Sequence, residues 1–120
     1  MGLYIGSTVI NTTDVEKGIA FWTAALGYVV RNADHTFAVL TAPSRRWSNV
    51  SLQLTSEPKN GTNRLHLDLY TSDQKGEVAR LEKLGAARVP WTYREGADYV
   101  VMADPDGNEF CVIQSPFTQD

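Results

Sequence analysis

The amino-acid sequence carries the same pattern twice. In each half an aspartate precedes a run of apolar residues at helical spacing, and the run ends at a Leu-Gly pair. The aspartates are Asp14 and Asp73, and the pairs lie at 26–27 and 84–85. Aspartate is favoured at a helix N-terminus, and glycine just beyond a C-terminus. With the alternating segments around them, both halves predict the order strand–helix–strand–strand–strand.

Alternating apolar and polar residues locate the strands, and turn-rich stretches separate them. In the first half we expect strands at 3–11, 28–32, 36–41 and 49–56. In the second half we expect them at 64–71, 86–93, 98–104 and 108–114. The segment EPKNGTN, residues 57–63, is the expected linker. A chain of 120 residues fits one α+β domain, with modules over about 1–56 and about 64–120.

Counting along the two halves pairs residues across the repeat. Ser7 and His66 each lie seven residues before the aspartate that begins their helix. Gln53 and Cys111 each lie 26 residues after the glycine that ends it. The counts therefore predict that Ser7 corresponds to His66 and Gln53 to Cys111.

Alternation also assigns the two faces of each strand. In the first strand of the second half, leucines oppose His66 and Asp68; in its last strand, Phe110 and Val112 oppose Cys111. The apolar faces must meet the helices, because those helices have apolar stripes to bury. The polar faces are either the solvent-facing side of the sheet or the lining of a pocket. Alternation alone leaves both interpretations open.

Composition excludes several classes of function. The net charge is -3 and the pI is about 5.3, whereas a nucleic-acid-binding surface is basic. No apolar run reaches membrane-spanning length, and the N-terminal residues do not form a secretory signal. A single cysteine cannot form an internal disulfide, which fits a reducing compartment. We therefore expect a cytoplasmic protein with neither nucleic-acid nor membrane partners.

Individual residues allow a structural and a functional interpretation. His66 is either a hydrogen-bonded histidine of the sheet or an acid/base group in a pocket. No basic residue flanks Cys111 to lower its pKa, so packing is favoured over a nucleophilic role. Trp47, beside Arg45 and Arg46, and Trp91 either pack in their segments or hold a planar or anionic ligand. Asp68, Glu109, Tyr70 and Tyr99 are further polar candidates.

Four segments together resemble a known superfamily. They are DVEKGIAFWTAALGY, LHLDLYTSD, LEKLGA and DPDGNEF, and they resemble the vicinal oxygen chelate superfamily, in its small glyoxalase-like branch. That superfamily includes glyoxalase I, extradiol dioxygenases, and bleomycin- and fosfomycin-resistance proteins. The resemblance implies two βαβββ modules whose mixed sheets curl around a cleft, often completed by a second subunit. It therefore favours a homodimer, and a pocket over a solvent-facing surface.

The resemblance also implies where a metal would bind. Metal-dependent members place one ligand on the first and one on the fourth strand of each module. Those positions are Ser7, Gln53, His66 and Cys111 in this chain. A hydroxyl and an amide are weak donors, which leaves the imidazole and the thiol as the two good ligands, fewer than a catalytic site uses. We therefore expect no cofactor and no catalytic metal.

Three functions remain open. The first is a small-molecule-binding protein of the resistance type, which holds an aromatic or hydrophobic ligand without a metal. The second is a metal-dependent glyoxalase-like lyase, isomerase or dioxygenase, and the third a metal-free enzyme with His66 as acid/base. The incomplete ligand set favours the first. The expected ligand pocket comprises Ser7, Gln53, His66, Cys111, Trp47, Trp91, Asp68 and Glu109.

Overall fold

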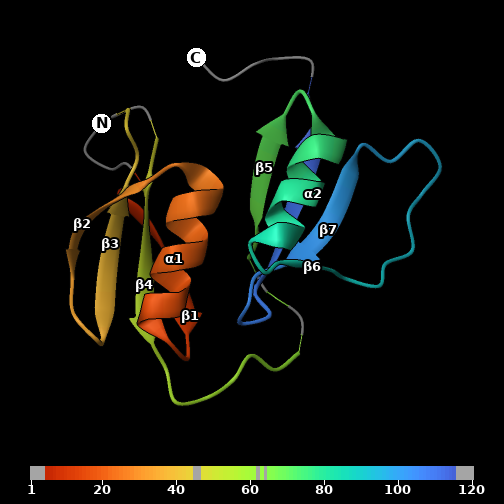
Figure 1. The fold of residues 1–120 in the computed structure, drawn as a ribbon. Coiled ribbons are helices and arrows are strands. Elements are labelled where there is room, and N and C mark those ends of the chain that lie inside the picture. Colours follow the sequence, from red (N-terminus) through yellow and green to blue (C-terminus); the bar gives the residue numbers. More distant parts are fainter. Residues whose placement is uncertain (1–4, 45–46, 62, 64, 116–120) are drawn as a thin grey trace. The chain divides into compact units, whose positions relative to one another are not determined.

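A computed structural model describes residues 5–44, 47–61, 63 and 65–115 of the chain. The chain forms two compact units, residues 1–58 and 59–120, which we call the first and second modules. Each module consists of one helix packed on one face of a four-stranded sheet (Figure 1). Among the described helices, none is both long enough and apolar enough to span a bilayer.

The first module contains one helix and four strands. These are β1 (Ser7–Thr12), α1 (Val15–Leu26), β2 (Val29–Ala33), β3 (Phe37–Thr41) and β4 (Asn49–Leu54). The sheet has the strand order β1-β4-β3-β2. β1 runs parallel to β4, and the other pairs are antiparallel.

The second module repeats this topology. Its elements are β5 (Leu67–Thr71), α2 (Gln74–Lys83), β6 (Ala87–Arg88), β7 (Tyr99–Ala103) and β8 (Glu109–Gln114). The strand order is β5-β8-β7-β6, and again only the first and last strands of the module pair in parallel. The predicted α+β fold of two βαβββ modules is confirmed, with two mixed sheets that do not close into a barrel.

Local capping interactions set the ends of both helices. The Asp14 carboxylate accepts a hydrogen bond from the Lys17 amide at 3.2 Å, and Asp73 accepts one from the Gly76 amide at 3.1 Å. Gly27 ends α1 with a φ of 72°, a conformation that disfavours residues with a Cβ. The aspartates predicted to begin the helices therefore do so.

The helices cover the apolar faces of the sheets, as expected. α1 buries Trp22 and approaches β4 so closely that a Cβ on Gly18 would lie 3.0 Å from the Leu52 side chain. α2 buries Val78 and Leu81, and the apolar face of its sheet is closed to solvent at Val112. Hydrophobic burial on these faces supplies the core of each module.

The strand predicted at 86–93 is wrong over most of its length. β6 comprises only Ala87 and Arg88, and Trp91 lies in the loop that connects β6 to β7. Pro90 has no backbone N–H to donate to a neighbouring strand, so pairing stops before it. β5 also begins later than predicted, and His66 immediately precedes it.

The predicted correspondence of Gln53 with Cys111 is also wrong. In the second module, Tyr99 begins β7 and pairs with Ile113, whereas in the first Phe37 begins β3 and pairs with Gln53. Gln53 therefore corresponds to Ile113. Two residues earlier on each last strand, Ser51 corresponds to Cys111. Counting failed because the connections on either side of the third strand differ in length between the modules.

Candidate functional site

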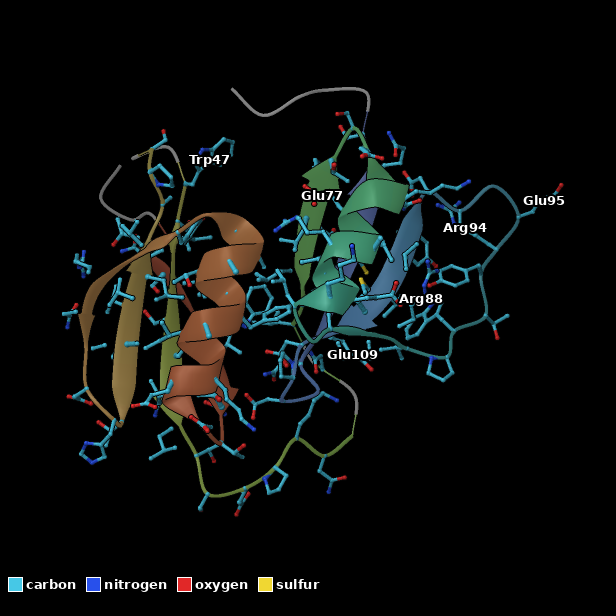
Figure 2. All side chains as sticks on the ribbon, viewed as in Figure 1. Trp47, Glu77, Arg88, Arg94, Glu95 and Glu109 are labelled. Atoms are coloured by element: carbon cyan, nitrogen blue, oxygen red, sulfur yellow. The ribbon has the colours of Figure 1, made fainter. Side chains whose placement is uncertain are left out.

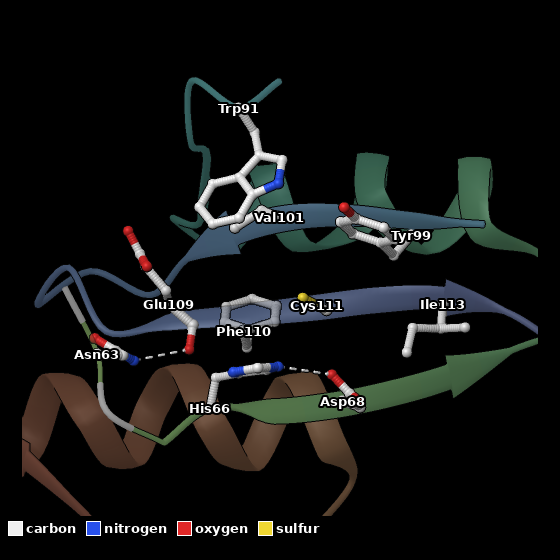
Figure 3. Close-up of a pocket in the computed structure, with 10 residues that line it drawn as sticks. All are labelled: Asn63, His66, Asp68, Trp91, Tyr99, Val101, Glu109, Phe110, Cys111 and Ile113. Carbon is white, nitrogen blue, oxygen red and sulfur yellow. Dashed lines mark hydrogen bonds and ion pairs between the residues drawn. The ribbon is translucent and has the colours of Figure 1, made fainter. Parts of the chain in front are cut away.

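A cavity of about 350 Å³ lies against the sheet of the second module, on the face that carries Cys111 (Figure 3). β7 and β8 form its floor, the segment leading into β5 forms one edge, and the β6–β7 loop forms the other. Every described residue that lines it belongs to the second module.

One wall of the cavity is aromatic and aliphatic. Val101 is buried at its floor, whereas the Trp91 side chain is 48% exposed. Tyr99 and Ile113 complete this wall. Figure 3 shows the Trp91 indole above Val101, facing the cavity. A ligand that entered could therefore bury indole surface that now contacts solvent.

Two interactions fasten the β6–β7 loop that carries Trp91. The Val89 amide donates to the Val101 carbonyl at 3.0 Å, and the Val101 amide donates to the Tyr93 hydroxyl at 2.8 Å. The ring of Tyr93 also lies 5.3 Å from that of Tyr99, centroid to centroid. Trp91 is thus held between two points anchored to β7, although it lies outside any strand.

The opposite edge of the cavity is polar. His66 Nε2 lies 3.2 Å from Asp68 Oδ1, and both side chains are about half exposed. Asp68 pairs directly with Cys111 across β5 and β8. The Asn63 amide group donates to the Glu109 carbonyl at 3.0 Å and so ties the segment before β5 to β8. The predicted candidates His66, Asp68, Glu109, Cys111 and Trp91 all line this cavity.

The electrostatics of the cavity act against a reactive thiol. Burial raises the pKa of Cys111, and the negative charges of Asp68 and Glu109 raise it further. A nucleophilic cysteine needs the reverse shift, because the thiolate is the reactive form. Cys111 is therefore a protonated thiol at neutral pH.

Three side chains could hold a metal. Ligand atoms of His66, Asp68 and Cys111 all lie within 4.8 Å of one another. Nitrogen, oxygen and sulfur donors suit zinc better than a hard cation such as magnesium. Sequence reasoning did not treat Asp68 as a ligand, although its spacing of two residues from His66 puts both on one face of the strand.

The first module does not bring together the two ligand positions that the resemblance implied there. Ser7 pairs with Asn49, whereas Gln53 pairs with Asn11, four residues farther along β1. The Ser7 hydroxyl instead hydrogen-bonds the Ser51 hydroxyl at 2.6 Å. In this module, Ser7 and Gln53 therefore do not form one half of a metal site.

A separate cavity of about 890 Å³ lies within the first module. Its lining includes Ser7, Ser51 and Trp47, but Gln53 is not among its described lining residues. Arg31 also lines it, a residue that sequence reasoning passed over. The arginines predicted to accompany Trp47, at 45 and 46, lie outside the described residues.

The model of the family described as "Glyoxalase-like domain" matches residues 7–113, from the start of β1 to the penultimate residue of β8, and so includes the lining of the second-module cavity. The chain belongs to the glyoxalase-like domain family. No curated protein sequence matches it.

Solved structures share the fold of this glyoxalase-like protein. A glyoxalase/bleomycin resistance protein/dioxygenase family enzyme from Burkholderia phytofirmans PsJN is 17% identical, with a TM-score of 0.70, and the match covers 89% of this chain and 94% of that one. A bleomycin-binding protein from Streptomyces verticillus, complexed with copper(II)-bleomycin, is 16% identical, with a TM-score of 0.64 and coverage of 96% and 99%. At such identities the likeness shows a shared fold.

Proposed function

We propose that this glyoxalase-like protein binds an aromatic or hydrophobic small molecule in the second-module cavity, without a catalytic metal. The observation that carries the proposal is the aromatic and aliphatic wall, above all the half-exposed Trp91 over a buried floor. Small-molecule sites are typically concave and mostly apolar, with a few polar groups that fix orientation.

The polar edge suits binding without chemistry. His66 and Asp68 offer hydrogen-bonding groups at this edge, and Glu109 offers a carboxylate on the side of Trp91. Cys111 adds a protonated thiol, which is a weak hydrogen-bond donor and behaves as a small hydrophobic group. The bleomycin-binding protein of Streptomyces verticillus shares the fold, and its ligand-binding role supports a similar role here.

Removing Trp91 tests the proposal. Purified protein is titrated with a panel of one- to three-ring aromatic compounds by equilibrium dialysis. For compounds that bind, Trp91→Ala should weaken affinity about tenfold or more, because a buried aromatic contact is worth about 1–3 kcal/mol. Trp47→Ala is the matched control, since Trp47 is similarly exposed but lines the first-module cavity. Equal losses in both variants, or none in Trp91→Ala, would reject this site.

A metal-dependent lyase, isomerase or dioxygenase is the second candidate, favoured by the convergence of His66, Asp68 and Cys111. When bound, the metal would supply Lewis-acid chemistry. Tag-free protein is incubated with zinc or cobalt, excess metal is removed, and metal per chain is counted by mass spectrometry. The binding-protein proposal predicts less than stoichiometric metal. One metal per chain, with a cobalt–thiolate absorption band lost in Cys111→Ser, would favour the second candidate instead.

A further inference from the structure

The charge around the second-module cavity is unbalanced. Asp68 and Glu109 line it, and no lysine or arginine is among its lining residues in the described part of the chain. Two basic side chains of the module form ion pairs outside the cavity lining. Arg88 faces Glu82, with Nε 3.7 Å from the carboxylate, and Arg80 pairs with Glu77.

The negative field reaches the floor of the cavity. Asp68 pairs directly with Cys111 across β5 and β8, and Glu109 lies two residues before Cys111 on β8. The two carboxylates therefore lie close to Cys111 on the floor, where each disfavours a further negative charge. The same field would stabilise a positive charge there. Fields of this kind are stronger in a partly enclosed cavity than in open water.

The aromatic wall also favours a positively charged ligand. The faces of tryptophan and tyrosine rings are negative and attract cations, tryptophan most strongly. In Figure 3 the Glu109 carboxylate stands on the same side of the cavity as the Trp91 indole. A flat cation between them would meet a ring face and a carboxylate together.

We propose that the ligand of this cavity is an aromatic cation, such as a planar ring system that carries a quaternary or protonated nitrogen. This inference rests on the proposed function and specifies the class of ligand. The first-module cavity differs, because Arg31 is its only charged lining residue among those described. Among the described residues, carboxylates and an aromatic wall thus occur together only in the second-module cavity.

Three bicyclic probes of similar shape separate the effect of ligand charge on affinity from the effect of hydrophobicity. They are 1-methylquinolinium, which is a permanent cation, 1-methylnaphthalene, which is its neutral isostere, and 1-naphthoate, which is an anion. Equilibrium dialysis should show the cation binding about tenfold tighter than the neutral probe, with the anion weakest, because only the cation gains from both the ring face and the carboxylates. Raising the salt concentration should weaken binding of the cation only.

Variants that neutralise one carboxylate test whether Asp68 and Glu109 cause the preference for the cation. Asp68→Asn and Glu109→Gln should each weaken binding of 1-methylquinolinium about three- to tenfold and leave 1-methylnaphthalene unchanged. Glu95→Gln is the matched control. Figure 2 shows Glu95 at the far end of the β6–β7 loop, and it does not line the cavity. The Glu95→Gln variant should bind all three probes with the same affinities as the original protein.

Each result has a distinct meaning. If the cation and the neutral probe bind equally, the charge inference is wrong while the proposed function stands. If no probe binds, both fail. Dialysis with EDTA distinguishes an organic cation from a metal ion, since binding of 1-methylquinolinium should persist in the chelator. Loss of that binding in EDTA would overturn the inference.

Discussion

Cys111 shows how neighbouring residues set the chemistry of a side chain. It occupies a position where the family resemblance implies a metal ligand, and Asp68 lies directly across from it on β5. A thiol beside carboxylates stays protonated, so the pair does not form a nucleophile. The polar groups of the cavity therefore suit recognition of a positive charge better than covalent catalysis.

The raised pKa of Cys111 gives a pH-dependent prediction. Iodoacetamide should modify Cys111 of the folded protein slowly at pH 7. The modification rate should increase at a higher pH in the folded protein than in the urea-unfolded chain. The sign follows because the folded state disfavours the thiolate. Asp68→Asn should increase the rate at neutral pH about two- to threefold, since it removes one of the charges but not the burial. Mass spectrometry of timed samples measures the rate.

The unfolded protein supplies the control in this alkylation experiment. It exposes Cys111 without its neighbours and should react as an ordinary thiol does. Modification of the folded protein at the unfolded rate, or an Asp68→Asn variant slower than the original, would contradict the electrostatic account.

Part of the site could be predicted from single residues. Strict alternation placed His66, Asp68 and Cys111 on a common face, and they do line one cavity. The convergence of their ligand atoms could not be predicted, because it depends on the β5–β8 register and on rotamers. Arg31 was missed for a similar reason, since nothing in the sequence marks the cavity that it lines.

At the scale of elements, short sequence signals were sufficient for the helices but not for every strand. The aspartate caps determine where both helices begin, and glycine ends α1. β6 was predicted too long because the hydrophobic residues around Pro90 resemble a strand, whereas the proline prevents pairing. The resulting loop carries Trp91 to the cavity, so the misassigned segment is also part of the candidate site.

Gly76 gives a prediction for α2. A Cβ at this position would overlap the Asp73 carboxylate that caps the helix. In the Asp73→Ala background, Gly76→Ala should raise the free energy of unfolding by up to about 1 kcal/mol through helix propensity. In the original protein the gain should be close to zero, because displacement of the cap costs about 1 kcal/mol. Urea unfolding followed by circular dichroism measures both.

The cap of the other helix provides a control for this double-mutant cycle. Asp14→Ala removes an equivalent cap from α1 but leaves Asp73 in place. Gly76→Ala should therefore gain little in the Asp14→Ala background, as in the original protein. Equal stabilisation in all three backgrounds would show that Gly76 does not protect the cap.

At the scale of the whole molecule, the repeat made the architecture predictable. Two copies of one element order, each with its own cap, define a βαβββ module twice. Residue counts between the copies were less reliable, because unequal connections shifted Gln53 away from the position of Cys111. The two cavities have accordingly diverged, with Arg31 lining one and carboxylates lining the other.

The three tryptophans allow the most direct test of where the ligand binds. Trp22 is buried in the first module, Trp47 lines the first-module cavity, and Trp91 lines the second. In protein labelled with ¹⁵N-tryptophan, the three indole N–H signals are assigned by single substitution and followed by NMR during titration with 1-methylquinolinium. We predict that the Trp91 signal shifts to saturation while those of Trp22 and Trp47 stay in place. A shift confined to Trp47, or no shift in any signal at millimolar probe, would contradict a ligand site in the second module.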